Sequence, residues 1–512
     1  MLSAVPPRSQ ASRTVGWAQI RRPAAGLLRL LSAHADLLAL LLFTCFLYFY
    51  LRLFSSALID DAFITLDYVR NILRSGTWGF FPGHVANTAT SPLNVILLTI
   101  TSLLSRNIVE SPLWLALCCF VAMAIVLDRL SLRLFGLKRF GRLATLALLL
   151  NPLLMSTLGL ESILFTTFLV ISLYCLVAGK WRSLAFVLGM LSLTRADGLL
   201  FAVVIMFVLP TTKIRLQSMG VLFLSILPWY LFSWLYLGSL VPDSLIIRTI
   251  QTSWQGSTFG NGILMYLRKY PAETILSFAY LPVLPAYLSG QVRDSRVLKV
   301  LLGLGLLHYL AYSALAVPPF HWYYVPEAAI IILFASFALG MLFQSTRSVR
   351  WQRRAAEAML ATAFLVPALG TLQLLARGGF RLAEMPIHSN LATQEQYREV
   401  GLWLKDNVHG KSVHIEGEIG TLAYYCDCLL LDEFSDRRWL TDGVQTVIAG
   451  HGPRAALYGL NFMFLREDAG FEPYSYLLTV RGDRESLSYP HVKAWETSTK
   501  WTPQAWILLG QY

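Results

Sequence analysis

The chain has 512 residues, of which 55% are hydrophobic and 14% are charged, and its mean hydropathy is +0.55. An average soluble domain is about 45–50% apolar and about 25% charged, so this composition excludes a soluble globular protein and predicts a polytopic membrane protein. The net charge of +12 would suggest a nucleic-acid partner in a soluble chain. In a membrane protein it is explained by basic residues that fix the topology, and we expect no nucleic-acid partner.

The apolar runs along the chain predict a multi-pass topology. Residues 1–33 carry several arginines, and the run 34–58 lacks a small-residue cleavage site, so we expect a retained helix that starts in the cytoplasm. Further apolar runs lie at 111–128, 143–159, 162–179, 183–194, 198–210, 216–237, 272–288, 298–317, 323–344 and 356–376.

The apolar segment 92–104 is expected to be an interfacial or re-entrant helix rather than a span. If it crossed the membrane, the basic cluster Arg129–Arg142 would lie outside, against the tendency of Lys and Arg to stay in the cytoplasm. Without it the chain crosses about eleven times, with the N-terminus inside and the C-terminus outside.

After the last long apolar run the sequence becomes more polar, and only short apolar segments remain. A helical pattern at Gln394–Val408 alternates with strand-like segments, which predicts a small external α/β domain. Strands are expected at Ser412–Ile415, Cys428–Leu431, Asn461–Leu465 and Ala505–Leu509. Cys426 and Cys428 would then share one face of a strand and could pair only under strain. The expected organisation is a cytoplasmic segment 1–33, a membrane domain 34–377 and an external domain 378–512.

Two adjacent carboxylates open the first external loop, 59–110. Asp60 and Asp61 follow directly after the first apolar run, where the C-terminus of that helix would not stabilise their charge. Charged groups are costly at a membrane, so the pair is a candidate general base or metal ligand. Helical periodicity follows the pair, then a glycine-rich aromatic turn, then a helix that begins at Ser91-Pro92.

The whole segment 60–98, DDAFITLDYVRNILRSGTWGFFPGHVANTATSPLNVILL, resembles the opening loop of a family of membrane glycosyltransferases. These are GT-C enzymes of the bacterial type, related to the arabinofuranosyltransferase that adds terminal β-1,2-arabinose in mycobacterial cell walls. Later stretches resemble the same family in order: Asn151–Ser162, Leu193–Gly198, Tyr236–Leu245, His321–Tyr324, Gly417–Gly420, Tyr424–Tyr425 and Leu431–Asp432.

The resemblance implies a GT-C fold with external juxtamembrane helices and an inverting sugar transfer from a polyprenyl-phosphate donor, in a membrane cavity open to the outside. It also implies that an aspartate of the first loop assists the transfer. We assign the role of base to Asp60 or Asp61, with a preference for Asp60, and expect the other to position the acceptor or a metal. Whether a divalent cation (Mg²⁺, Mn²⁺ or Ca²⁺) takes part is left open, with Asp60, Asp61 and Glu161 as its candidate ligands.

A glycosyl phosphate leaves as a phosphate, so the enzyme needs cations or hydrogen-bond donors for that anion. The candidates are Arg195, Arg248 and His321, with Tyr323 or Tyr324 as a hydroxyl donor. Glu161 and Asp197 are expected to face the same substrate site. The alternatives are structural: an Arg195–Asp197 clamp, a snorkelling Arg248, an aromatic belt at the Trp-Tyr-Tyr run, and a helix-start carboxylate at Glu161.

The expected acceptor is a cell-envelope glycan, a glycolipid or a surface protein, and the expected location is a bacterial plasma membrane with a periplasmic C-terminal domain. Arabinofuranose is the first choice of sugar, with mannose and aminoarabinose as alternatives within the fold. A transporter or flippase for lipid-linked saccharides is the main alternative outside it, although such a protein would be expected to show paired halves and broken helices. A lipid-pyrophosphate polymerase or ligase is the third hypothesis.

Overall fold

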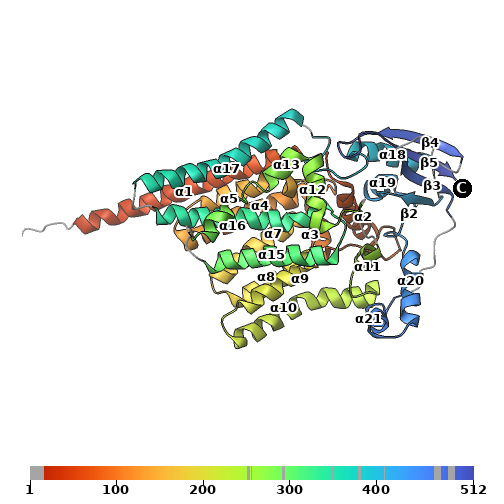
Figure 1. The fold of residues 1–512 in the computed structure, drawn as a ribbon, viewed down its shortest axis with the longest axis horizontal. Helices are drawn as coiled ribbons and strands as arrows, with labels where there is room; N and C mark the ends of the chain where they lie inside the picture. The colour runs from red at the N-terminus through yellow and green to blue at the C-terminus, as the bar shows by residue number, and fades with distance from the viewer. Residues whose placement is uncertain are drawn as a thin grey trace, which may run out of the picture. The chain divides into compact units, whose positions relative to one another are not determined.

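The computed structural model describes residues 17–250, 254, 256–290, 295–346, 350–378, 382–408, 410–465, 474–481 and 490–512. Residues up to Tyr50 form one compact unit and Leu51–Tyr512 form a second, which contains all the candidate site residues. Most of the described chain is helical, and a small sheet lies in its C-terminal part (Figure 1).

Helices make up the part of the chain that precedes this sheet. Six of the described helical segments are long and apolar enough to span a membrane: His34–Arg52, Ser111–Phe135, Thr212–Leu237, Arg296–Leu315, His321–Ser345 and Arg353–Arg377. The elements are α1 (Trp17–Arg52), α2 (Asp60–Ser75), α3 (Pro92–Ser105), α4 (Ser111–Phe135), α5 (Phe140–Leu149), α6 (Pro152–Met155), α7 (Ser162–Val177), α8 (Trp181–Thr194), α9 (Gly198–Phe207), α10 (Thr212–Phe232), η1 (Ser233–Leu237), α11 (Asp243–Ile250), α12 (Phe259–Lys269), α13 (Pro271–Ser277), α14 (Val283–Leu288), α15 (Arg296–Leu315), η2 (His321–Tyr324), α16 (Val325–Ser345) and α17 (Arg350–Gly378).

This architecture confirms a polytopic helical membrane protein, while the count of about eleven spans stays a prediction. The expected span at 272–288 is wrong as a single helix, because α13 and α14 are separate and Pro282 precedes α14. Proline disfavours helical backbone in the residue before it, here Leu281, so α14 does not extend back towards α13, which ends at Ser277. The run at 143–159 is likewise divided at Asn151, whose side chain caps α6 by accepting the Leu154 N–H at 2.9 Å.

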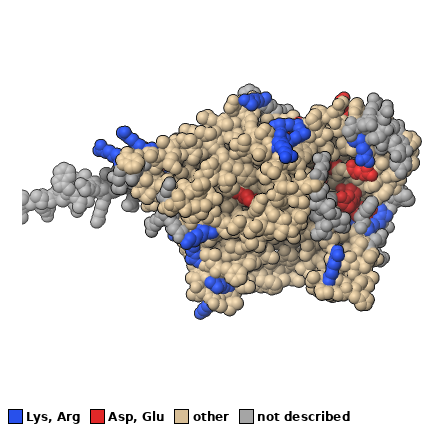
Figure 2. Space-filling model, in the orientation of Figure 1, with Lys and Arg blue, Asp and Glu red and all other residues tan. Residues whose placement is uncertain are grey.

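The outer surface of the bundle has the apolar character that lipid requires. Figure 2 shows few charged side chains on the face over α15 and α16, with Lys and Arg towards the two ends of the bundle. Leu306 and Leu310 of α15 are 62% and 54% exposed. Apolar side chains this exposed are stable facing acyl chains and unfavourable facing water.

The C-terminal part contains a five-stranded mixed sheet with helices, which confirms the expected α/β domain. The strand order is β2-β1-β3-β5-β4; β1 is parallel to both β2 and β3, and β5 is antiparallel to both β3 and β4. The elements are α18 (Gln394–Asn407), β1 (Val413–Glu416), α19 (Gly420–Cys426), β2 (Leu430–Leu431), α20 (Arg438–Ala449), α21 (Pro453–Asn461), β3 (Tyr476–Arg481), β4 (His491–Thr497) and β5 (Ala505–Gln511).

The expected strand at Asn461–Leu465 is wrong. The helix α21 ends at Asn461, and the next residue, Phe462, is its C-cap. The Phe462 N–H donates to the Tyr458 carbonyl at 2.9 Å. A short apolar run is compatible with either a strand or the end of a helix, so the sequence alone does not distinguish them. Its Phe462 instead packs with Ile247, Leu440 and Val444 in a small core.

The acidic pair Asp60-Asp61 lies at the N-terminus of α2, not at the C-terminus of the preceding helix as we expected. The helix α1 ends at Arg52, so a short connection separates it from α2. The positive end of the α2 dipole therefore stabilises both carboxylates. The helix stops at Gly76, whose positive φ of 69° suits glycine and whose N–H bonds to the Ile72 carbonyl.

The C-terminal domain contacts the membrane helices at several places, and two of these contacts bear on the site described below. The helix α19 packs along α2. Arg437, at the start of α20, pairs with Asp243 at the start of α11, with Nε 2.9 Å from Oδ2, and donates to Ser239 Oγ at 3.0 Å. Both contacted helices, α2 and α11, contribute residues to the cavity described next, so the domain helps to hold the cavity walls.

Candidate active site

A cavity of about 130 Å³ lies where the ends of several helices meet. Its walls come from α2, the segment before α3, the α7 and α9 starts, α11, α15, η2 and the loop before α20. The residues that carry its polar groups and aromatic rings are Asp61, Thr65, Thr88, Thr90, Ser91, Glu161, Arg195, Asp197, Ser244, Tyr312, Trp322, Tyr323 and Phe434. Segments far apart in sequence thus converge on one polar site.

The cavity brings together five of the residues predicted from the sequence. Asp61, Glu161, Arg195, Asp197 and Tyr323 all line it. They come from four separate segments of the chain, so their convergence depends on the packing of the bundle. This is the arrangement that a polar substrate site among helix ends requires.

The structure places three other predicted residues elsewhere. Asp60 is 3% exposed, and its carboxylate accepts the Gly420 and Thr421 N–H groups at 2.8 and 2.7 Å. His321 is fully buried, with its ring nitrogens near Ser389 Oγ and the Ser156 carbonyl. The Tyr324 hydroxyl donates to the Phe259 carbonyl at 2.6 Å. None of the three is among the residues that line the cavity.

Arg248 lies in α11, but its side chain is outside the described part of the structure. The first turn of the same helix lines the cavity through Ser244 and Leu245.

Arg195 is the centre of a buried charge network at the cavity floor. Its Nε and Nη2 atoms donate to the Asp197 carboxylate at 2.8–3.1 Å, and its Nη1 atom lies 3.0 Å from Glu161 Oε1. The guanidinium also lies over the Tyr323 ring, at 5.9 Å from the centroid. Burial raises the pKa of Asp197, but the stronger combined effect of Arg195 and hydrogen bonds holds it well below its usual value.

The network continues deeper through residues that our sequence analysis missed. Tyr312 donates its hydroxyl to Asp197 Oδ2 at 2.9 Å, and His308 Nε2 lies 3.0 Å from the same oxygen. The other ring nitrogen of His308 lies 2.6 Å from Glu327 Oε1. His308 and Glu327 stand inside apolar runs, and an ionisable residue in such a run is itself a signal of function that the sequence contained.

The described lining of the cavity carries more carboxylates than cations. Asp61, Glu161 and Asp197 face it together with Arg195. Burial raises the pKa of Glu161, while the charge of Arg195 lowers it and the charges of Asp197 and Asp61 raise it further. The charge of Asp61 therefore adds to the effects that favour the protonated form of Glu161.

The metal prediction named Asp60, Asp61 and Glu161 as ligands. The structure separates them, because the Asp60 carboxylate is bound to the N-terminus of α19 while the other two line the cavity. Within the described residues, no three or more His, Cys, Asp and Glu side chains are grouped to hold a metal ion. Two oxygen donors remain, and the divalent cation stays a prediction.

Asp60 joins the first loop to the C-terminal domain. Its two hydrogen bonds satisfy N–H groups at the start of α19, where a helix leaves such donors without partners. Burial raises the pKa of Asp60, against the lowering effect of those N–H groups. Burial, followed by the charge of Asp60, also raises the pKa of Glu418 to about 8. Asn390 links the two, since it accepts the Asp60 N–H and donates to Glu418 at 2.9 Å.

The stability of the protein is expected to fall as the pH rises towards 8, because of Glu418. In the folded protein the pKa of Glu418 is about 8, whereas in an unfolded chain the same carboxyl group has its ordinary pKa of 4.5. The folded state therefore binds more protons in this window. The contribution of Glu418 to the free energy of unfolding is greatest below pH 4.5. It decreases as the pH rises from 4.5 to about 8, by up to about 1.4 kcal/mol per pH unit.

The measurement is the thermal unfolding midpoint of the purified protein in detergent across this pH range. Glu418→Gln replaces the titrating group by a neutral side chain of similar size, whose single carbonyl oxygen can still accept from Asn390. Its midpoint is therefore expected to change less with pH. An unchanged pH slope in this variant would contradict the assignment.

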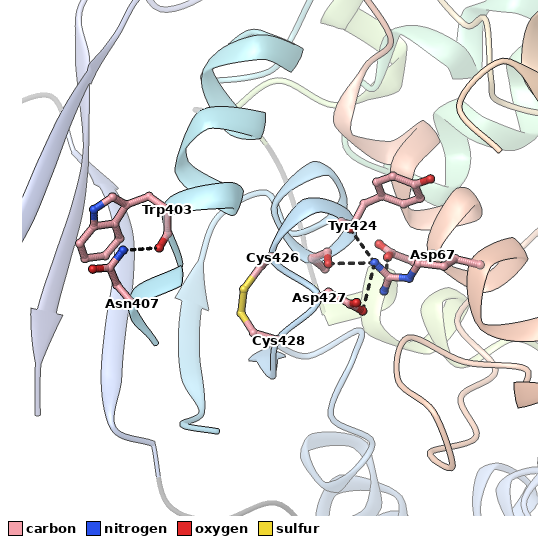
Figure 3. Close-up of a disulfide and its surroundings, with 9 residues drawn as sticks. Asp67, Trp403, Asn407, Tyr424, Cys426, Asp427 and Cys428 are labelled. Carbon is pink, nitrogen blue, oxygen red and sulfur yellow. Dashed lines mark hydrogen bonds and ion pairs between the residues drawn. A yellow bond between two sulfur atoms is a disulfide. The ribbon is translucent and has the colours of Figure 1, made fainter. Parts of the chain in front are cut away.

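The far end of α2 is tied to the far end of α19 (Figure 3). Arg70 donates from Nη1 to the Ala423 and Tyr424 carbonyls at 3.2 and 2.6 Å, and its Nη2 lies 2.8 Å from Asp67. A cation at the C-terminus of α19 complements the carboxylate of Asp60 at its N-terminus. The helix α19 is thus held by charges of opposite sign at its two ends, and α2 supplies both.

Cys426 and Cys428 form a disulfide next to this contact (Figure 3). We expected the two cysteines to share one face of a strand, and this is wrong. Cys426 ends α19, and β2 begins only at Leu430. Asp427 between them has a φ of 52°, which turns the chain and brings the two Cα atoms to 5.1 Å. The same turn presents the Asp427 carboxylate to Arg74 at 2.9 Å.

Reduction of this disulfide is expected to lower the stability modestly. The loop that it closes has a sequence separation of only 2, so the lost constraint on the unfolded chain corresponds to about 1–2 kcal/mol. The measurement is the thermal midpoint with and without a phosphine reductant. The double variant Cys426→Ser/Cys428→Ser is expected to have the lower thermal midpoint both with and without the reductant. Cys45, Cys118, Cys119 and Cys175 are free in either case, so six free thiols in the mass spectrum of the isolated protein, rather than four, would refute the prediction.

Comparisons with known proteins show the fold. The structure matches that of ArnT from Cupriavidus metallidurans bound to undecaprenyl phosphate, with a TM-score of 0.58, 13% identity, and coverage of 93% of this chain and 98% of that one. It also matches the oligosaccharyltransferase of Archaeoglobus fulgidus in the apo form, with a TM-score of 0.52, 11% identity, and coverage of 86% and 69%. No family model and no curated protein sequence matches the chain.

Both matches extend over most of this chain, from the membrane helices into the C-terminal domain. Their low identity means that the shared feature is the arrangement of the helices and not the detail of the site. The chain is therefore a multi-pass membrane protein with the fold of the GT-C glycosyltransferases.

Proposed function

We propose that the protein is an inverting glycosyltransferase that moves a sugar from a polyprenyl-phosphate donor to a hydroxyl group of a cell-envelope glycan, a glycolipid or a surface protein. The observation that carries the proposal is the single cavity that holds Asp61, Glu161, Arg195 and Asp197 at the helix ends. The fold adds support, since the similar ArnT structure contains undecaprenyl phosphate.

Asp61 is the proposed general base. A hydroxyl that attacks a glycosyl phosphate must lose its proton, and a carboxylate within reach accepts it. Asp61 lines the cavity, whereas both oxygens of Asp60 accept backbone N–H groups of α19. We therefore move the base from Asp60, our first choice from the sequence, to Asp61. Asp60 takes the role of holding the start of α19 against the start of α2.

Arg195 is the proposed partner of the donor phosphate, with Tyr323 beside it. The leaving phosphate develops charge as the glycosidic bond breaks, and fixed cations and donors stabilise it. Because Glu161 and Asp197 already share the charge of Arg195, a second cation is needed to balance the anion. Arg248, on the helix whose first turn lines the cavity, is the proposed source of that charge. His321 and Tyr324 act on the fold instead, through their buried contacts with backbone and Ser389.

Arabinofuranose is the proposed sugar, on the resemblance of the first loop to the arabinofuranosyltransferases. Mannose and aminoarabinose remain alternatives, because no side chain in the described cavity distinguishes one sugar from another. The proposed location is a bacterial plasma membrane, with the N-terminus in the cytoplasm and the cavity and C-terminal domain outside. The positive charge of the cytoplasmic segments supports this orientation.

The test is transfer in proteoliposomes that contain synthetic polyprenyl-phosphate arabinofuranose, mannose or aminoarabinose. An oligoarabinoside, a glycolipid and a peptide serve as acceptors. The expected result is a product from one donor with inverted anomeric configuration, seen by NMR, and release of polyprenyl phosphate. Movement of intact donor to the opposite leaflet without any product would instead favour the transporter hypothesis.

A further inference from the structure

The helices α20 and α21 form a hairpin with an exposed apolar surface. Leu457, Leu460, Met463 and Phe464, which we call the hairpin patch, are 66%, 49%, 60% and 39% exposed. The opposite side of the hairpin is buried in a small core, where Leu440, Val444 and Phe462 pack with Ile247 of α11. The hairpin is thus packed on one side and carries a second, exposed apolar face on the other.

The hairpin is fastened to the end of a membrane helix. The Trp234 indole N–H donates to the Leu460 carbonyl at 2.9 Å, and its ring packs on Phe464 with centroids 5.0 Å apart. The Val241 N–H donates to Asn461 Oδ1 at 2.9 Å. At Gly238 the two backbones approach so closely that an added Cβ would lie 2.9 Å from Leu465 Cα. These contacts fix the depth of the hairpin relative to α10 and η1, and Figure 1 shows α21 beside the end of α10.

The exposed surface of that membrane helix continues into the hairpin patch. Only 11% of the residues in the most apolar part of the span Thr212–Leu237 are buried inside the protein, so most of its apolar surface is available to lipid. At its end Leu231, Leu235 and Tyr236 are 43%, 50% and 46% exposed. Trp234 lies in the same turn and holds the patch. The Trp234–Phe464 contact thus joins the exposed apolar side chains at the end of this helix to the hairpin patch.

We propose that the α20–α21 hairpin is seated in the membrane leaflet on the side of the C-terminal domain, with the hairpin patch in contact with acyl chains. Continuity with the lipid-facing surface of α10 and η1 identifies the lipid as the occupant. Arg454, at the start of α21 and 5.6 Å from the Tyr458 ring centroid, supplies a cation at the level of the phosphate groups. An interfacial helix pair with one apolar face and a basic flank binds bilayers in this way.

This seating connects the membrane surface to the cavity. The inner side of the hairpin holds Ile247 of α11, and Phe434, just before α20, lines the cavity and packs on the same core. The lipid would thus support two walls of the cavity from outside. The inference rests on the membrane fold and the contacts of the hairpin, and it does not depend on the sugar-transfer proposal.

The experiment measures lipid contact directly in the full-length protein. The free cysteines Cys45, Cys118, Cys119 and Cys175 are replaced by Ala, and an NBD label is placed through Leu457→Cys or Leu460→Cys. Val492→Cys is the matched control, since Val492 is an apolar residue that is 45% exposed on β4, away from the hairpin in Figure 1. The proteins are reconstituted in phosphatidylcholine vesicles with and without doxyl-labelled phosphatidylcholine.

The doxyl lipid is expected to quench the labels at 457 and 460 by about twofold, at every protein-to-lipid ratio, and to leave the label at 492 nearly unchanged. Equal and weak quenching at all three positions would overturn the proposal. Quenching that grows with the protein-to-lipid ratio and needs no doxyl lipid would also overturn it, because a second copy of the chain would then cover the patch. Met463→Cys replaces any labelled variant whose thermal midpoint is lowered.

Discussion

Asp61→Asn is expected to lower kcat for sugar transfer by about 10²–10⁴-fold, the usual contribution of a general base, with little change in stability. The substitution keeps the size of the side chain and removes only its ability to accept a proton at neutral pH. Asp61 lies in the cavity wall at the N-terminal turn of α2, so the change leaves the contacts of α2 with α19 in place. The measurement is single-turnover transfer from the polyprenyl-phosphate donor, with the thermal midpoint as the test of folding.

Asp60→Asn is the matched control, since it makes the same chemical change one residue earlier. Asn offers one acceptor where the carboxylate accepts both the Gly420 and Thr421 N–H groups. We expect a loss of about 1–3 kcal/mol in stability and only a modest loss of kcat. The opposite pattern, with full activity in Asp61→Asn and a catalytic loss in a stable Asp60→Asn, would return the role of base to Asp60.

Arg195→Gln is expected to remove both activity and stability. The buried guanidinium balances Glu161 and Asp197, and leaving buried carboxylates without their partner costs about 3–5 kcal/mol. Loss of activity in this variant alone does not distinguish a phosphate ligand from a structural clamp. The double variant Arg195→Gln/Asp197→Asn makes that distinction, because it removes one of the stranded charges.

The double variant is expected to recover most of the thermal midpoint and none of the activity, if Arg195 binds the donor phosphate. The decisive measurement is the binding of polyprenyl phosphate in detergent, which the double variant is expected to lose. Recovery of transfer to near the wild-type rate would show that Arg195 serves only to hold Glu161 and Asp197 in place.

The parts of the fold that sequence could predict are those set by local rules. Pro92 after Ser91 starts α3 as expected, because proline fits the first turn of a helix. The apolar runs gave the membrane class, and the change of texture near residue 378 gave the α/β character of the C-terminal domain. The short apolar run at Asn461–Leu465 failed because neither its length nor its period separates a strand from a helix end.

The choice between Asp60 and Asp61 depended on tertiary structure. Successive residues of a helix point about 100° apart, so Asp60 and Asp61 face different surroundings. Which one faces the cavity is decided by α19, whose Gly420 and Thr421 lie far along the chain and take the Asp60 carboxylate. A sequence pattern within the first loop contains no information about that partner.

The sequence by itself determined that this is a helical membrane protein, that carboxylates and an arginine lie at helix ends, and that its motifs resemble those of lipid-linked-sugar transferases. Hydropathy and local capping are properties of neighbouring residues, and they are readable in one dimension. The tertiary structure alone decided that Asp61, Glu161, Arg195 and Asp197 share a cavity, that His308 and Glu327 support it, and that α20 and α21 expose an apolar face beside α10. Those relations arise from packing between distant segments, where long-range contacts select one partner among many.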